Sequence, residues 1–187
     1  PVGILDRHRT RSELLSSNTG VYLGYSSSDF QCVLAASPMS TSVYSATGCS
    51  QSIASGRLSY ALGLNGPCSL IDTACSAGLV ATSFGRGALI LGECNVANVM
   101  AVNLILSPDG AHTPFAIAGM TSATGKCHTF DKHTDGYSRS EACGAAVLQT
   151  TSHELAGLVT LEGRDVCADG RSDALTAAKG EEQRRGI

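Results

Sequence analysis

Cys75 is the residue whose type and surroundings most clearly suit chemistry. It lies in the run Asp72-Thr73-Ala74-Cys75-Ser76, between a short apolar stretch and a segment of helical character. A residue at a sharp strand-to-helix turn presents its side chain at the end of a sheet. The first turn of the helix adds unpaired N–H groups and a positive dipole end, which favour a thiolate and can stabilise an oxyanion. We therefore predict acyl exchange with a thioester, in which the attacking and leaving groups are both thiols.

The alternative interpretation is that Cys75 is one more structural thiol in a cysteine-rich chain. The smallest gap between cysteines is seven residues, so the Cys-x-x-Cys pair of a zinc knuckle is excluded. Several cysteines lie in apolar stretches, where a free thiol behaves as a small hydrophobic group. We expect reduced thiols and no metal site. The eight cysteines are at positions 32, 49, 68, 75, 94, 127, 143 and 167.

The elements that must position Cys75 can be predicted from hydrophobic periodicity. A glycine-bounded apolar run over 20–25 predicts a strand, and the spacing of apolar residues over 51–62 predicts an amphipathic helix. Gly63, Gly66 and Pro67 end that helix, and residues 68–73 follow as a short buried strand. The nucleophile candidate therefore stands directly after a strand.

The segment from Ser76 to Gly92 predicts an unusual helix. Arg86 is its only charged residue, and it contains Gly78, Gly85 and Gly87, each of which costs about 1 kcal/mol relative to Ala. A helix with three glycines and almost no polar face is not a free surface helix. We expect it to be buried, with other backbone packed closely against it.

The remainder of the chain continues the alternation of strand and helix signals, which indicates an α/β protein. Residues 97–106 predict a strand, and residues 145–148 and 158–162 predict two more. Between them, residues 115–139 are rich in Gly, Thr, Asp and His and predict a long irregular loop, a feature that is often functional.

Composition excludes several functional classes. The chain has 187 residues, 43% hydrophobic and 16% charged, which suits one globular domain or part of one. Its formal net charge of −3 gives no reason to expect nucleic acid or an anionic membrane as partner. We find no apolar run of membrane-spanning length and no signal peptide. Because the chain opens Pro1-Val2-Gly3 without Met, we expect it to be a piece of a longer protein.

Several motifs occur in an order that resembles the ketosynthases, the condensing domains of polyketide and fatty-acid synthases. The resemblance runs from about Gly20 to Gln183 and is closest to type I polyketide synthases. Its central motif is Gly66-Pro67 followed by Ile71-Asp72-Thr73-Ala74-Cys75-Ser76. The others are 52–60, Leu62-Gly63-Leu64, Gly92-Glu93-Cys94, Val102-Asn103-Leu104, Phe130-Asp131, Asp135-Gly136-Tyr137 with Arg139 and Glu141, and 169–172.

This resemblance implies a thiolase-like fold of α-β-α-β-α layers, of which residues 1–187 would supply mainly the N-terminal half, truncated at both ends. It implies that Cys75 is the catalytic nucleophile of a beta-ketoacyl-acyl carrier protein synthase, in polyketide or fatty-acid biosynthesis. Cys75 would take an acyl group, and a malonyl-type thioester would then decarboxylate and condense with it. No cofactor would bind the chain directly, because the partner acyl carrier protein carries the phosphopantetheine arm. A homodimer and a cytoplasmic or plastid location are also implied.

The chain departs from the family pattern at several positions. Ser76-Ala77-Gly78 replaces the usual run of serines, and Arg139-Ser140-Glu141-Ala142 replaces Arg-Gly-Glu-Gly. The family's two catalytic histidines belong to later motifs that are absent here, and the five histidines, at 8, 112, 128, 133 and 153, lie in neither motif. We expect the 187-residue chain alone to be inactive, and His128 and His133 to have loop-supporting or solvated roles.

Other motif residues have structural interpretations. We expect Asp131, Asp135, Arg139 and Glu141 to hold the long loop together by hydrogen bonds and ion pairing, rather than to bind substrate. Asp72 and Thr73 are interpreted as hydrogen-bonding residues at the strand end. Two functional alternatives stay open: a thiolase-type enzyme that acts on coenzyme A thioesters, and a non-condensing, ketosynthase-like partner.

Overall fold

One mixed sheet forms the centre of the computed structural model, which describes residues 2–5, 9–26, 29–150, 159–173, 179–180 and 184. Its strand order is β3-β2-β4-β5-β1-β6. The strands are β1 (Val2–Leu5), β2 (Thr19–Gly24), β3 (Cys68–Ile71), β4 (Val96–Asn103), β5 (Ala142–Thr150) and β6 (Thr160–Leu161). The helices are α1 (Arg11–Leu14), α2 (Phe30–Ala35), η1 (Pro38–Thr41), α3 (Ser45–Cys49), α4 (Gln51–Leu62), η2 (Ala74–Ser76), α5 (Ala77–Leu91), α6 (Pro108–Ala111) and α7 (Thr113–Ile117).

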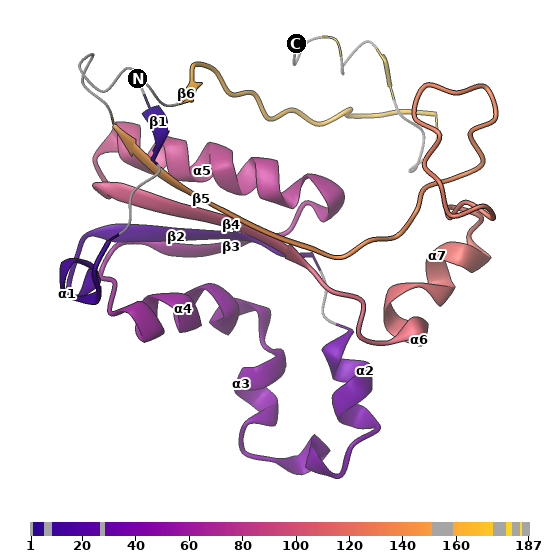
Figure 1. Cartoon of the computed structure of the whole chain (residues 1–187), viewed down its shortest axis with the longest axis horizontal. Helices are drawn as coiled ribbons and strands as arrows, with labels where there is room; N and C mark the ends of the chain where they lie inside the picture. Colours follow the sequence, from indigo (N-terminus) through magenta and orange to yellow (C-terminus); the bar gives the residue numbers. More distant parts are fainter. Residues whose placement is uncertain are drawn as a thin grey trace.

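The strands β3, β2 and β4 run parallel, so their connections must cross over the sheet. Gly24 at the end of β2 is level with Ile71 of β3 and with Ala101 of β4. The helix α4 connects β2 to β3 and α5 connects β3 to β4, and Figure 1 shows them on opposite sides of the sheet. The two connections cross the sheet in opposite directions, from β2 to β3 and then from β3 past β2 to β4. Because both connections are right-handed, their helices must lie on opposite faces. The carboxyl ends of these three strands therefore meet at one edge.

The strand β5 runs antiparallel to both of its neighbours in the sheet. It pairs antiparallel with β4 along 96–103 and with β1 on its other side, and β1 pairs antiparallel with β6. The start of β5 consequently lies at the same edge as the ends of β2, β3 and β4. Residues far apart in sequence are thus brought together near Cys75.

Burial along β2 shows that both faces of the sheet are covered. Every residue of β2 is buried, and Val21, Tyr22 and Leu23 are 0%, 3% and 6% exposed. Successive side chains of a strand point to opposite faces, so an unbroken buried run needs a layer on each side. The core cluster between the sheet and α5 consists of Val2, Tyr22, Ile71, Val80, Ala81, Ala88, Leu89, Cys94, Ala97, Val99 and Leu148.

Glycines allow α5 to lie very close to the sheet. A Cβ atom at Gly85 would stand 2.6 Å from Val99 Cγ1, and one at Gly78 would stand 2.8 Å from Ala101 Cβ. At the end of β2, a Cβ on Gly24 would stand 2.6 Å from the backbone of Ala77. The predicted close packing is therefore confirmed, although side chains fill the space beside the helical glycines: mainly those of β4 at Gly78 and Gly85, and that of Arg164 at Gly87.

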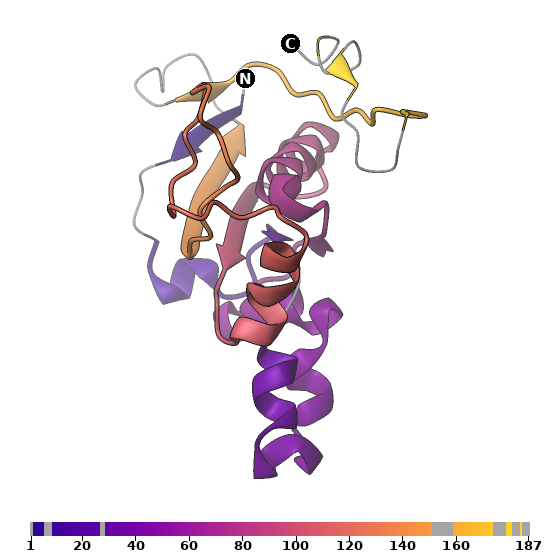
Figure 2. The same cartoon turned by 90° about the vertical axis from the view of Figure 1, so that its right-hand side faces the viewer.

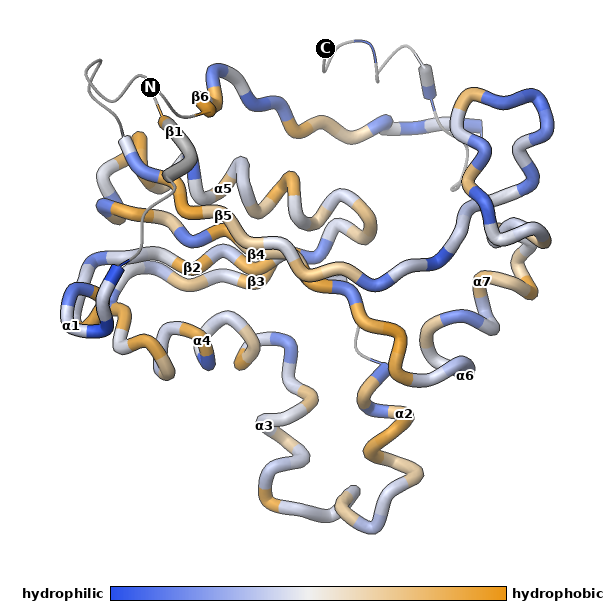
Figure 3. Tube along the Cα trace, viewed as in Figure 1, coloured by the Kyte–Doolittle hydropathy of each residue, from blue (hydrophilic) through white to orange (hydrophobic). Residues whose placement is uncertain are grey.

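The prediction that the whole of α5 is buried is wrong for its outer side. Leu79, Phe84, Ile90 and Leu91 are 79%, 54%, 57% and 74% exposed. The described residues cover mainly the side of α5 that faces the sheet, so much of its remaining apolar surface is open. Figure 3 shows the mixed hydropathy of this helix.

The stretch Ala74–Leu91 is long and apolar enough to span a membrane by length and composition, contrary to the prediction from sequence. In the structure 44% of this stretch is buried, and α5 packs along β4 and β2. A core helix passes the same test of length and composition. This stretch is the one candidate span within the described ranges.

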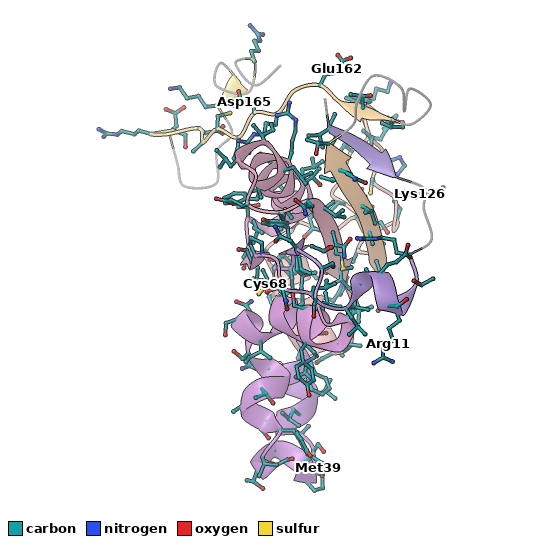
Figure 4. The ribbon with its side chains drawn as sticks, turned by 90° about the vertical axis from the view of Figure 1, so that its left-hand side faces the viewer. Arg11, Met39, Cys68, Lys126, Glu162 and Asp165 are labelled. Atoms are coloured by element: carbon teal, nitrogen blue, oxygen red, sulfur yellow. The ribbon has the colours of Figure 1, made fainter. Side chains whose placement is uncertain are left out.

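Residues 29–50, which we call the arm, extend away from the sheet. The arm contains α2, η1 and α3, and Figures 1 and 2 both show it projecting from the body. Figure 4 places Met39 near its tip and Glu162 at the opposite end of the molecule. No charged residue occurs from Phe30 to Gly56, and Met39, Val43 and Tyr44 are exposed.

Most predicted elements are confirmed in type and place. The helix α4 ends at Gly63 and α5 ends at Gly92, and both glycines have the left-handed conformation of a helix C-cap. The strand predicted over 97–106 ends at Asn103, and the loop predicted from Phe115 begins later because α7 occupies 113–117. The strand predicted over 145–148 is the longer β5. Part of the strand predicted over 158–162 lies outside the described residues, and β6 accounts for 160–161.

Candidate functional site

Cys75 lies where the sequence predicts, between a strand and a helix. β3 ends at Ile71, the single 3-10 turn η2 covers Ala74–Ser76, and α5 begins at Ala77. The Cys75 side chain is exposed, so its thiol is not sealed within the sheet. An exposed thiol at the carboxyl edge of parallel strands is placed as a nucleophile in an α/β protein would be.

The residue before Cys75 has an unusual backbone conformation. Ala74 has φ of 55°, in the left-handed region that residues with a Cβ rarely occupy. The Asp72 Oδ1 atom accepts a hydrogen bond from the Ala74 N–H at 3.0 Å, which closes an Asx turn from Asp72 to Ala74. The prediction that Asp72 is a hydrogen-bonding residue at the strand end is confirmed.

The residue after Cys75 is fixed as well. The Ser76 hydroxyl donates to the Thr73 carbonyl oxygen at 2.8 Å and lies 2.9 Å from the Thr73 hydroxyl. The backbone N–H of Ser76 also donates to the Thr73 carbonyl, and that of Ala77 donates to the Ala74 carbonyl. These two amides are therefore occupied within the turn, and the expectation of unpaired N–H groups directly after Cys75 is wrong for them.

The segment after β4 is held at the same edge of the sheet by side chains from distant elements. Asp29, which is 8% exposed, accepts the N–H groups of Leu106 and Ser107 through Oδ2, both at 2.6 Å. Glu141 Oε1 accepts the Ile105 N–H at 2.8 Å. Two carboxylates thus satisfy three successive amides and fix the path of the chain from β4 into α6. Glu141 thus makes a structural hydrogen bond, as predicted, but its partner lies in the segment after β4 and not in the long loop.

The loop between α7 and β5 is closed by an isolated bridge between Thr121 and Tyr137. Hydrogen bonds to Ser122 lower the pKa of the exposed Asp135 carboxyl below its usual value. The Arg139 guanidinium lies 4.6 Å from the centre of the Phe115 ring. The hydrogen bonding of Asp135 supports the loop as predicted, whereas the contact of Arg139 with an aromatic ring was not predicted.

Two histidines of this loop also have local partners. His133 Nδ1 lies 2.9 Å from Asp131 Oδ1, and His128 Nε2 lies 3.3 Å from the Thr124 hydroxyl. The loop-supporting roles predicted for both histidines are confirmed. His8 and His153 lie outside the described residues.

A second cysteine, Cys94, has the opposite environment to Cys75. It is 2% exposed and lies beside Tyr22, and burial raises the pKa of its thiol and the pKa of the Tyr22 hydroxyl. The Tyr22 hydroxyl makes no well-formed hydrogen bond within the described part of the chain. Cys94 is therefore a core thiol, of the kind that was the alternative interpretation for Cys75.

Potential metal-ligating side chains do not cluster in the part of the chain that the structure describes. Across the described ranges, no group of three or more His, Cys, Asp or Glu side chains could hold a metal ion. Cys75 itself is a free thiol.

The fold and the turn define an α/β protein with an exposed cysteine at the carboxyl edge of its sheet. A model of the beta-ketoacyl synthase N-terminal domain matches residues 4–154. The chain therefore belongs to the beta-ketoacyl synthase family. Its relatives are type I polyketide synthases, and its fold is the thiolase-like fold of ketosynthases.

Two polyketide synthases illustrate the similarity. The chain is 39% identical over 178 residues to erythronolide synthase EryA3 of Saccharopolyspora erythraea, covering 93% of this chain and 6% of that protein. It is 36% identical over 168 residues to the highly reducing polyketide synthase fogA of Aspergillus ruber, covering 88% of this chain and 7% of that protein. The chain thus spans a small part of these relatives.

A solved ketosynthase has the same fold. The ketosynthase from module 6 of the bacillaene synthase of Bacillus subtilis superposes with a TM-score of 0.79 and 32% identity, over 94% of this chain and 29% of that chain. These similarities do not favour either alternative, the thiolase-type enzyme or the non-condensing partner.

Sequence reasoning missed the contacts that join distant segments at this site. Asp29 was not singled out, because nothing in its local sequence shows that it meets amides 77 and 78 residues away. The left-handed Ala74 was missed because Ala, unlike Gly, gives no signal of positive φ. The Asp72-Thr73-Ala74 spacing is the signal that could have revealed the Asx turn.

Proposed function

We propose that this chain is part of a polyketide synthase condensing domain, a beta-ketoacyl-acyl carrier protein synthase, and that Cys75 is its acyl-carrying nucleophile. The observation that carries the proposal is the exposed Cys75 thiol on a fixed strand-to-helix turn, within a chain of this family. Residues 1–187 would form the part of the domain that holds the nucleophile.

The proposed first step is a thioester exchange. The Cys75 sulfur attacks the carbonyl carbon of an acyl thioester, the carbonyl carbon–sulfur bond of that thioester breaks, and its thiol leaves with the proton. Acyl and leaving thiol are supplied by an acyl carrier protein with a phosphopantetheine arm, as the family membership suggests. The exposure of Cys75 suits a donor of this size, because a thiol as deeply buried as that of Cys94 could not be reached by the donor.

The proposed second step forms the carbon–carbon bond. A malonyl-type thioester loses carbon dioxide, its carbanion attacks the carbonyl of the Cys75 thioester, and Cys75 leaves as a thiolate that takes up a proton. The product is a β-ketoacyl thioester with two more carbons. His128 and His133 have loop partners, so this step would need groups supplied by other parts of the protein.

The test is acyl loading of the polypeptide that contains this chain. After incubation with an acyl thioester, mass spectrometry should find the acyl group on the peptide that carries Cys75, and Cys75→Ala should abolish the loading. Cys143→Ala is a matched control, because Cys143 is also exposed and lies within β5. Undiminished loading of Cys75→Ala would overturn the assignment of the nucleophile.

Two further measurements separate the reaction types. The acyl carrier protein thioester should be a better donor than the coenzyme A thioester. The 187-residue chain alone should not catalyse decarboxylative condensation at the rate of a complete domain, since its sequence contains neither of the family's two histidine motifs. A full condensation rate from the 187-residue chain would contradict the proposal that the second step needs groups from other parts of the protein.

A further inference from the structure

We propose that Asp72 is a positioning residue, which holds Ala74 in the left-handed conformation and thereby sets the presentation of the Cys75 thiol. This inference rests on the proposed role of Cys75. Its test nevertheless measures the reactivity of the thiol directly, without any acyl donor.

The backbone conformation of Ala74 is energetically costly. A φ of 55° brings the Cβ of an L-residue close to its own backbone, so an unrestrained Ala leaves this conformation. Such conformations persist where surrounding contacts hold them. The turn before Cys75 therefore requires contacts that fix the peptide groups on both sides of the Ala74 Cα atom, so that only a positive φ joins them.

The Asp72 carboxylate fixes the peptide group on one of these sides, between Thr73 and Ala74, because its bond to the Ala74 N–H restrains the torsions of Asp72 and Thr73. Its Oδ1 accepts the Ala74 N–H at 3.0 Å, and this bond forms only when the chain folds back over Asp72. On the far side of Cys75, the Ser76 hydroxyl is bound to Thr73. Cys75 is thus the one residue of the turn between two fixed neighbours.

Close packing beneath the turn prevents the helix from absorbing a change at Ala74. A Cβ atom at Gly24 would stand 2.6 Å from the Ala77 carbonyl carbon and oxygen and from the Gly78 nitrogen. The end of β2 therefore supports the first residues of α5 directly. If Ala74 relaxed, the change would have to occur in the exposed residues of the turn, and it would move Cys75.

Two substitutions separate geometry from charge. Asp72→Asn keeps the acceptor oxygen in place and removes the charge, whereas Asp72→Glu keeps the charge and moves the oxygen by one methylene. The readout is the rate at which iodoacetamide alkylates Cys75 in the 187-residue chain, measured by peptide mass spectrometry. The exposed Cys143 is the internal reference, and the buried Cys94 reports any general loss of structure.

In the Asp72→Asn variant we expect the ratio of the Cys75 alkylation rate to the Cys143 alkylation rate to equal that of the wild type. We expect Asp72→Glu to alter that ratio by about fivefold, the factor that corresponds to one ordinary hydrogen bond. Ala74→Gly in the Asp72→Glu background should restore part of the ratio, because Gly accepts positive φ without strain. Cys94 should stay protected in all four proteins.

The proposal is overturned if Asp72→Glu leaves the ratio unchanged, or if Asp72→Asn changes it by as much as Asp72→Glu. A change confined to Asp72→Asn would show a charge effect and would overturn it too. Loss of Cys94 protection in Asp72→Glu would show general unfolding in place of a positioning effect, and would overturn it as well. Failure of acyl loading would remove the proposed function, and the alkylation ratios would still decide the role of Asp72.

Discussion

At the residue scale, the shared environment of Cys94 and Tyr22 predicts how the stability of the chain depends on pH. Both groups are buried beside each other, and burial raises the pKa of each above its ordinary value of 9.0 or 10.0. Above pH 9 the unfolded chain therefore releases protons that the folded chain keeps. The free energy of unfolding should fall as the pH rises, by at most about 1.4 kcal/mol per pH unit for each group.

The measurement is urea unfolding at pH 8, 9 and 10. Cys94→Ala lowers stability at every pH because it removes buried volume, yet its stability should decline less steeply between pH 9 and pH 10 than that of the wild type. Cys143→Ala, which removes an exposed thiol, should keep the wild-type slope. If the unfolding free energy of Cys94→Ala fell with pH as steeply as that of the wild type, the Cys94 thiol would not be a group that keeps its proton in the folded chain.

The residue scale also shows how far the sequence could define the site. The position of Cys75 at a strand-to-helix turn follows from local patterns, since the apolar run before it and the helix after it are both readable. The contacts that fix the neighbouring segment after β4 do not follow from local patterns in the same way. Asp29 and Glu141 act on amides of the segment after β4, and only the folded sheet brings them there.

At the element scale, glycines of two helices should respond oppositely to substitution. Gly85 of α5 faces β4, where an added Cβ would stand 2.6 Å from the stiff side chain of Val99. Gly56 of α4 has no atom within 4 Å of such a Cβ. Gly85→Ala should therefore destabilise the chain by about 1–3 kcal/mol, whereas Gly56→Ala should stabilise it by about 0.5–1 kcal/mol.

Thermal and urea unfolding of the two variants check this prediction. Both substitutions change the same residue type inside a helix, so the intrinsic helix propensity gained is equal. The difference between the variants therefore measures the contact of α5 with β4. Equal stabilisation by Gly85→Ala and Gly56→Ala would show that α5 does not lie this close to the sheet.

The same helix explains which elements were predictable. Three glycines and a nearly uncharged sequence indicated close packing, and that packing is present on the side that faces β4. The polar contacts of α5 with residues 161–164 were not predictable, because they come from a distant segment. Arg164 donates to the Ser83 carbonyl at 2.6 Å, and Arg86 donates to the carbonyls of Leu161 and Glu162.

At the scale of the whole molecule, the sheet is covered on both faces while one helical layer is left open. α5 covers the sheet on one side, and much of its own outer side is left apolar and exposed. The predicted five-layer fold would have further elements on this side. The arm was not predicted, because residues 30–50 carry no charge and show no clear apolar period, so the sequence indicated neither its helices nor its projection from the sheet.

The exposed side of α5 predicts the solution behaviour of the 187-residue chain. Leu79 and Leu91 are 79% and 74% exposed, and exposed apolar side chains of this kind promote self-association. Replacing both by Lys should lower self-association and the binding of an apolar dye such as ANS. The unfolding midpoint should change little, because neither side chain loses buried contacts and Lys is a good helix former.

Sedimentation and dye fluorescence of the 187-residue chain check this prediction, and Leu89→Lys is its matched control. Leu89 lies in the same helix but is 5% exposed, so a charge there should unfold the chain instead of improving its solubility. Self-association that persists in the Leu79→Lys/Leu91→Lys double variant would show that another surface is responsible, and the exposed apolar residues of the arm (Met39, Val43 and Tyr44) would be the next candidates. In a complete condensing domain the double substitution should instead reduce stability, since a layer that covers α5 would there bury both positions.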